Sequence, residues 1–133
     1  MASKIDIGNV VLCEHVVPGL GNKHTLINVY SGDLIVTELP AKLMLALYME
    51  YSAKAPEAFE VLVEIMMNKK DFGRLRFAVE AGPQLGVMAI PHMELGFDRD
   101  VVLEVRATVD GEKARRVLRK HVALGVMPID PTA

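Results

Sequence analysis

The fold is decided by residues 59–79, FEVLVEIMMNKKDFGRLRFAV. Every second side chain in the first half is apolar, which is typical of a β-strand with one face toward a core. These positions are Phe59, Val61, Val63, Ile65 and Met67. A polar run at 68–71 then predicts a hairpin loop, and the alternation resumes behind it.

The return strand of this hairpin has Leu75 in its apolar series and basic residues on its other face. Glu60 and Glu64 on the first strand should therefore lie near Arg74 and Arg76 on the second. Cross-strand charge pairs of this kind contribute about 0.2–1 kcal/mol each. The sequence predicts the hairpin without fixing its register.

Similar short runs, separated by Gly, Pro, Asn and Asp, extend the β pattern in both directions. They cover residues 5–17, 23–30, 34–37, 85–90, 92–97 and 100–109. Pro91 is expected to end the run at 85–90. Asp110-Gly111 is a favoured two-residue hairpin turn, and it predicts a strand returning along 101–109.

Two segments have the composition of either a strand or a helix. Residues 41–52 are rich in Leu, Met and Ala, yet both faces of a period-two strand are apolar, which favours a strand covered on both sides. Residues 112–126 also fit a helical stripe, but the preceding turn favours a strand. No βαβ rhythm or internal repeat is present.

The expected fold is therefore all-β: an antiparallel β-sandwich of about eight strands. Residues 1–127 would form a single domain, and 128–133 a loose C-terminal tail. A small β-barrel, or a β-sandwich with one helix at 112–124, is the alternative.

Composition narrows the functional classes. An apolar share of 51% in 133 residues excludes a disordered chain. The net charge of −2 gives no general attraction to nucleic acid or to an anionic membrane. The first residues contain no apolar signal-peptide core, and no apolar run is long enough to span a bilayer. A cytoplasmic protein is expected.

Cys13 is the only cysteine, so it is the first candidate for a nucleophile. Alternation puts it on the same strand face as His15, and either His15 or His24 would act as its base in a small enzyme. However, the next residue is Glu14, whose charge opposes a thiolate, and lone cysteines are commonly buried as small hydrophobes. The sequence therefore leans against catalysis.

The four histidines give no metal motif, since no pair has the spacing of ligands on one helix face. They are His15, His24, His92 and His121. A single cysteine also excludes a four-thiolate zinc site. Neither a metal nor a cofactor is expected.

One basic cluster stands out at 113–121. Its patch residues are Lys113, Arg115, Arg116, Arg119 and Lys120. Such a cluster contacts a phosphate backbone or an acidic partner in some proteins. No aromatic residue is interleaved for base stacking, so the sequence favours a solvated face over a nucleic-acid accessory role.

Apolar residues on the nominally outer faces of two strands are the best functional indication. The interface candidates are Met44, Ala46, Tyr48, Leu62 and Met66. Either a second layer of the same chain covers them or a partner does. The sequence also shows few features that protect edge strands from pairing with another chain. A homo-oligomer or a protein partner is therefore expected.

Most of the chain, and its first fifty residues above all, resembles a family of small uncharacterised bacterial proteins, a domain of unknown function. The shared features are Cys13-Glu14 in the first strand, a Lys-x-Thr-Leu-Ile second strand at 23–27, Leu39-Pro40, and a Leu-Tyr-x-Glu strand at 47–50. The family carries Gly where this chain has Asn22. The resemblance implies a β-sandwich, with no assigned activity and no catalytic residues to transfer.

Together these features favour a non-catalytic protein-interaction or oligomerisation module. The alternatives are a small enzyme that uses Cys13 and His15, and a nucleic-acid accessory protein that uses the basic 113–121 segment.

Overall fold

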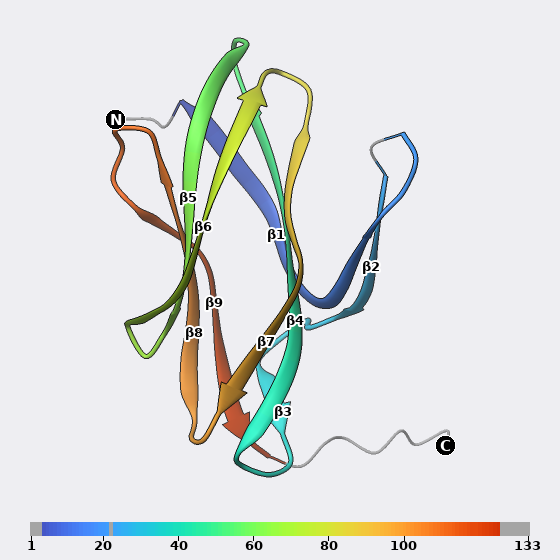
Figure 1. The fold of residues 1–133 in the computed structure, drawn as a ribbon, viewed down its shortest axis with the longest axis vertical. Helices are drawn as coiled ribbons and strands as arrows, with labels where there is room; N and C mark the ends of the chain where they lie inside the picture. The colour runs from blue at the N-terminus through green and yellow to red at the C-terminus, as the bar shows by residue number, and fades with distance from the viewer. Residues whose placement is uncertain (1–3, 22, 126–133) are drawn as a thin grey trace.

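The computed structural model describes residues 4–21 and 23–125, and all of its regular structure is β (Figure 1). The strands are β1 (Ile5–Pro18), β2 (His24–Val29), β3 (Leu34–Val36), β4 (Ala41–Ala53), β5 (Glu57–Met67), β6 (Lys70–Ala81), β7 (Gly86–Phe97), β8 (Val101–Val109) and β9 (Arg115–Leu124). The predicted all-β class is confirmed. The predicted tail at 128–133 lies outside the described residues.

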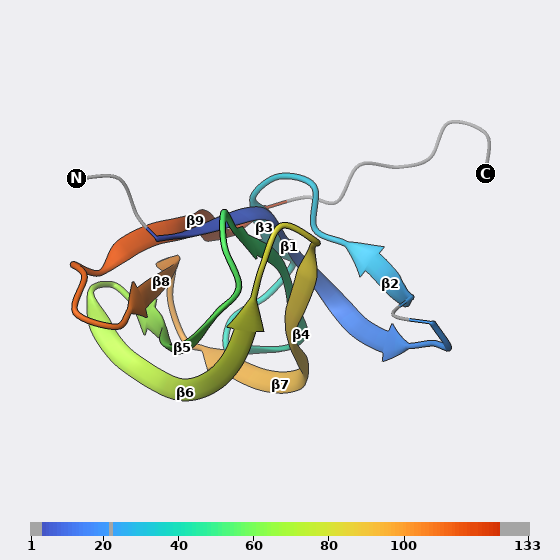
Figure 2. The same ribbon diagram turned by 90° about the horizontal axis from the view of Figure 1, so that it is seen from above.

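The strands form two sheets. Sheet A has the order β2-β1-β4-β7, and sheet B has the order β3-β9-β8-β5-β6. The sheets pack face to face, as a β-sandwich requires, and sheet B curls strongly at β5 and β6 (Figure 2). This curl resembles part of a barrel wall, which is the feature that the structure shares with the small β-barrel considered as an alternative.

The core lies between the two inner faces. Sheet A contributes Leu45, Leu47 and Met49 from β4, and sheet B contributes Val61 from β5 and Leu103 from β8, all fully buried. Strict alternation produces this arrangement, because successive side chains of a strand point to opposite faces. Aliphatic residues and methionines dominate the interior, because only 5% of the residues in this chain are aromatic.

Both ambiguous segments are strands. Residues 41–52 lie within β4, which pairs with β1 on one side and β7 on the other. The helix considered at 112–124 is wrong, because Arg115–Leu124 form β9 against β8. β9 carries an irregularity opposite Val105 and Arg106, and this extra residue disturbs the period-two pattern enough to resemble a helical stripe.

Pro91 does not end a strand. β7 continues through it, with a register shift between the pairs Leu45–Met93 and Leu47–Ile90. A proline is tolerated here because β7 is the last strand of sheet A, where a missing amide hydrogen costs no ladder bond.

The two predicted hairpin turns differ from expectation. The β5–β6 turn is only Asn68-Lys69, with both residues at positive φ, as a type I′ turn requires. By contrast, five residues connect β8 and β9, although Asp110-Gly111 predicts a tight turn. Asp110 is held by β5 instead, because its carboxylate accepts the Glu60 amide hydrogen at 2.8 Å.

One strand pair departs from the antiparallel pattern. β3 follows β2 of sheet A along the chain, but it belongs to sheet B, where it runs parallel to β9 at the edge. Side chains and backbone fix it there: the Asp33 carboxylate accepts the His121 amide hydrogen at 3.1 Å, and Lys120 Nζ donates to the Gly32 carbonyl at 2.9 Å. The cis peptide Leu39–Pro40 then leads into β4.

No described segment forms a helix long and apolar enough to cross a membrane.

Shortening a central core residue tests this packing. Leu103→Ala should lower the free energy of unfolding by about 2–5 kcal/mol, because β8 is enclosed and the cavity cannot collapse. Leu124→Ala is the matched control, since Leu124 ends β9 with 55% of its surface exposed and should change stability by less than about 0.5 kcal/mol. Urea unfolding measures both, and equal losses would contradict the core assignment.

Candidate functional site

Most of the chemically reactive side chains gather on the outer face of sheet A. Cys13 and His15 come from β1, His24 from β2, Tyr48 from β4 and His92 from β7. Register explains the grouping: Cys13 lies opposite Ala46, and Val11 lies opposite Tyr48, so their side chains share the face turned away from the core.

A hairpin arm partly covers this face. The end of β1 and all of β2 stand away from the rest of the sandwich (Figures 1 and 2). Val16 and Leu26 on the arm form a small second apolar cluster with Cys13 and Ala46. The His24 ring packs edge-on against Tyr48, with centroids 5.6 Å apart. The outer face of β4 is therefore covered in part by the chain itself.

Cys13 is fully buried, and its thiol donates to the His15 carbonyl at 3.3 Å and to the Ala46 carbonyl at 3.8 Å. Burial raises the pKa of the Cys13 thiol, only partly opposed by backbone hydrogen bonds of His15 and Ile27. A raised pKa keeps the sulfur protonated, and a protonated thiol is a poor nucleophile. The thiol contacts the backbone of His15 rather than its ring.

The His15 ring stacks on His92, with centroids 5.8 Å apart and planes 10° from parallel. Imidazole lone pairs lie in the ring plane, so two stacked rings do not direct them at one ion between them. In residues 4–21 and 23–125, no group of three or more His, Cys, Asp or Glu side chains is placed to hold a metal ion.

Tyr48, Glu50 and Asn9 form a hydrogen-bond network on the same face. The Tyr48 hydroxyl donates to Glu50 at 2.8 Å, and the Asn9 amide donates to the other carboxylate oxygen. The hydrogen bond from Asn9 is the largest cause that lowers the pKa of Glu50, and the hydrogen bond from Tyr48 is the next. The same bond to Glu50 raises the pKa of Tyr48. Neither shift produces a base or an acid poised near neutrality.

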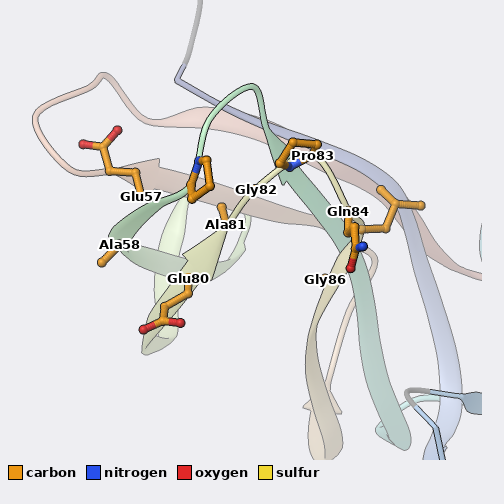
Figure 3. A pocket seen from close by; sticks show the side chains of 10 residues that line it. Glu57, Ala58, Glu80, Ala81, Gly82, Pro83, Gln84 and Gly86 are labelled. Atoms are coloured by element: carbon orange, nitrogen blue, oxygen red, sulfur yellow. The ribbon is translucent and has the colours of Figure 1, made fainter.

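One hollow lies at the end of the sandwich, between the β4–β5 and β6–β7 connections (Figure 3). Its lining is mostly Pro, Ala and Gly, with Glu57 and Glu80 as its charged residues. Glu57 lies opposite Ala81, and Ala58 lies opposite Glu80, so the two carboxylates are on different faces of sheet B. They cannot act as a catalytic pair.

The basic patch predicted at 113–121 is divided between faces. Arg115 donates to the Ile5 carbonyl at 2.8 Å, and Lys120 reaches the Gly32 carbonyl. Arg116 and Arg119 instead lie opposite Arg106 and Glu104, on the outer face of sheet B. Lys113 is exposed in the β8–β9 connection.

The interface candidates are also divided. Met44, Ala46 and Tyr48 belong to β4 of sheet A, whereas Leu62 and Met66 belong to β5 of sheet B. All five are on outer faces, which lie on opposite sides of the sandwich, so they do not form one continuous patch. Ala46 is fully buried beneath the arm, and the other four are half-buried.

Sequence reasoning missed the exposed apolar edge of β6. This strand ends sheet B, and its only pairing partner among the described strands is β5. Its inward series includes Leu75, which is 44% exposed, and the half-buried Phe77. Phe72 at the start of the strand is 47% exposed. The alternation at 72–79 was a signal for this strand, but nothing local distinguishes an edge from a central position.

Comparison with models of known protein families finds no match to this chain, and comparison with curated proteins finds no similar sequence. The resemblance to a bacterial family of unknown function therefore stays a prediction.

Thiol labelling tests the assignment of Cys13. In the native protein at pH 8, a disulfide reagent should label Cys13 roughly a hundredfold or more slowly than in denaturant, because the thiol is exposed only by local opening. A Cys13→Ala, Ser31→Cys double variant serves as a control, since residue 31 is in an exposed loop and should react at once. Rapid native labelling of Cys13 would restore the enzyme hypothesis.

Proposed function

We propose that this chain is a non-catalytic interaction module that forms a homodimer by pairing β6 with β6 of a second copy. The observation that carries the proposal is the open edge of sheet B. It is a strand of twelve residues with exposed apolar side chains, and no described strand pairs with the backbone on its outer side. Figure 2 shows β6 along the outer rim of the curled sheet.

The contrast with the other edges supports this choice. Natural proteins protect edge strands by making them short, by adding proline or bulges, or by pointing charges inward. β3 has only three residues, β2 has six, and β7 contains Pro91 and a register shift. Between Gly73 and Ala81, β6 has no proline, no bulge and no inward-pointing charge. It does carry Arg74, Arg76 and Glu80 on its outer face, so pairing with a second copy requires a register in which these charges complement each other.

The sequence of β6 is self-complementary about a two-fold axis through Phe77. In that antiparallel register, Arg74 faces the partner's Glu80, and Leu75 faces the partner's Val79. Phe77 meets the partner's Phe77 at the axis. Both outer charges are exposed, and Glu80 has no ion pair with any described residue. Arg74 pairs with Asp71 at 2.6 Å and lies 3.8 Å from Glu64, so it would share its guanidinium between these carboxylates and the partner's Glu80. Opposite charges directly across an antiparallel pair are stabilising.

Other registers fit less well. An axis through Leu75 would put Arg74 opposite the partner's Arg76, which is a repulsive pair. An axis through Ala78 pairs Arg76 with the partner's Glu80, but it shortens the paired segment from nine residues to seven. The Phe77 register therefore has the longest ladder without like charges.

The two alternatives have weaker support. An enzyme that uses Cys13 and His15 would need a reactive thiol, whereas this thiol is buried and its pKa is raised. A nucleic-acid accessory protein would need the basic segment on one surface, whereas its residues are divided between two faces.

A charge-exchange experiment tests the dimer and its register together. The unmodified chain should show about twice the single-chain mass of 14.6 kDa by light scattering. Glu80→Arg alone and Arg74→Glu alone should each be monomeric, because each puts two like-charged pairs across the axis. An equal mixture of the two variants should return to the dimer mass, because both pairs become attractive.

Glu38→Arg is the matched control, since it makes the same charge change at an exposed position in the β3–β4 connection and should remain dimeric. Thermal unfolding checks that every variant folds. A monomeric unmodified chain would contradict the proposal, and a mixture that stays monomeric would contradict the register.

A further inference from the structure

The outer face of sheet B carries charged side chains in rows across its strands. One row runs from Arg74 on β6 through Glu64 on β5 and Arg106 on β8 to Arg116 on β9. Adjacent strands are about 4.8 Å apart, so side chains at neighbouring register positions are within reach of one another. Arg106 and Arg116 are therefore two like charges placed directly opposite each other.

The next row contains Glu104 of β8, with Arg119 of β9 opposite it. Glu104 is only 7% exposed and is the one buried charged residue in the described part of the chain. Arg106 Nη2 donates to its carboxylate at 3.2 Å. A buried carboxylate requires a charged partner, and Arg106 is the partner of Glu104. The single negative charge of Glu104 balances the charge of only one guanidinium.

Two shallow hollows meet at Glu104. Lys69, Arg106 and Arg116 line one of them, and Lys69 and Arg119 line the other. Four cations thus surround one carboxylate. Within residues 4–21 and 23–125, Lys69, Arg116 and Arg119 have no hydrogen-bond or ion-pair partner for their side chains. Like charges held together on a rigid sheet are destabilising unless an anion neutralises them.

From this arrangement we infer that the outer face of sheet B binds the phosphoryl group of a small, soluble, multiply charged ligand between Arg116, Arg119 and Lys69. Guanidinium groups match phosphoryl oxygens with two parallel hydrogen bonds, and Lys69 adds a mobile point charge from the β5–β6 turn. Both arginines are on the same strand of the sheet, which holds their backbones in place before the ligand arrives.

The same geometry disfavours a polymer. A nucleic-acid backbone needs a track of cations, but Arg115 and Lys120 are bonded elsewhere and leave only a compact cluster. No aromatic side chain lines either hollow for base stacking. A compact anion with two or more charges therefore fits the cluster best.

Calorimetric titration with inorganic pyrophosphate tests the site at about 0.01 M ionic strength, where screening is weak. Binding should be measurable with the unmodified chain. Arg116→Gln and Arg119→Gln should each weaken it about tenfold or more, since each removes charge-assisted hydrogen bonds. Arg76→Gln is the matched control: Arg76 is on the same sheet but pairs with Glu60 outside the hollows, and its loss should change affinity less than about twofold.

Thermal unfolding verifies that each variant is folded, and unchanged light-scattering mass separates this site from the β6 edge. Absence of pyrophosphate binding would overturn the inference, as would an equal loss in Arg76→Gln. Tighter, Arg116-dependent binding of a single-stranded oligothymidylate, or of vesicles of phosphatidylcholine and phosphatidylserine, would also overturn it, because the site would then recognise a polymer or a membrane surface.

Discussion

The packing of one apolar face of each sheet against the other is the interaction on which the structure depends. β4 and β8 occupy interior positions in their sheets, and their inward side chains, such as Leu47 and Leu103, are fully buried. Each buried aliphatic side chain of this size contributes about 1.5–3 kcal/mol relative to an exposed one. Two open sheets bury these side chains between them without closing into a barrel. Each sheet therefore keeps two edge strands and an outer face.

Those outer faces and edges hold the candidate nucleophile, the unpaired strand and the basic cluster of the described residues. On sheet A, Val16 and Leu26 of the hairpin arm pack with Cys13 and Ala46, so the candidate nucleophile is enclosed in a second apolar cluster. On sheet B, none of the strands and connections in residues 4–21 and 23–125 forms such an arm over the outer face or the rim. The β6 edge and the cationic cluster around Glu104 consequently remain open, and the two proposed binding surfaces rest on them.

Local pattern predicted much of the fold, because strand alternation is a property of neighbouring residues. It predicted the β5–β6 hairpin and its charge pairing, which the Glu64–Arg74 register and the 2.7 Å bond between Arg76 and Glu60 confirm. It could not distinguish edge from central strands, since sheet order depends on distant segments. Two further predictions were wrong because they also depend on sheet position. Pro91 does not end its strand, since an edge position tolerates a proline. The basic run at 113–121 does not form one surface, since strand geometry puts Arg115 and Arg116 on different faces.

The central claim, that β6 pairs with its own copy about Phe77, is tested most directly by cysteine cross-linking. Antiparallel partners on an axis have Cα atoms about 4.5–5.5 Å apart, within the range of a disulfide. In a Cys13→Ala background, Phe77→Cys should therefore form a covalent dimer under mild oxidation, and Leu75→Cys, which faces the partner's Val79 instead of its own copy, should not. Cross-linking of neither variant, in a chain that is folded by thermal unfolding, would contradict the account, and cross-linking of Ala78→Cys in place of Phe77→Cys would contradict its register.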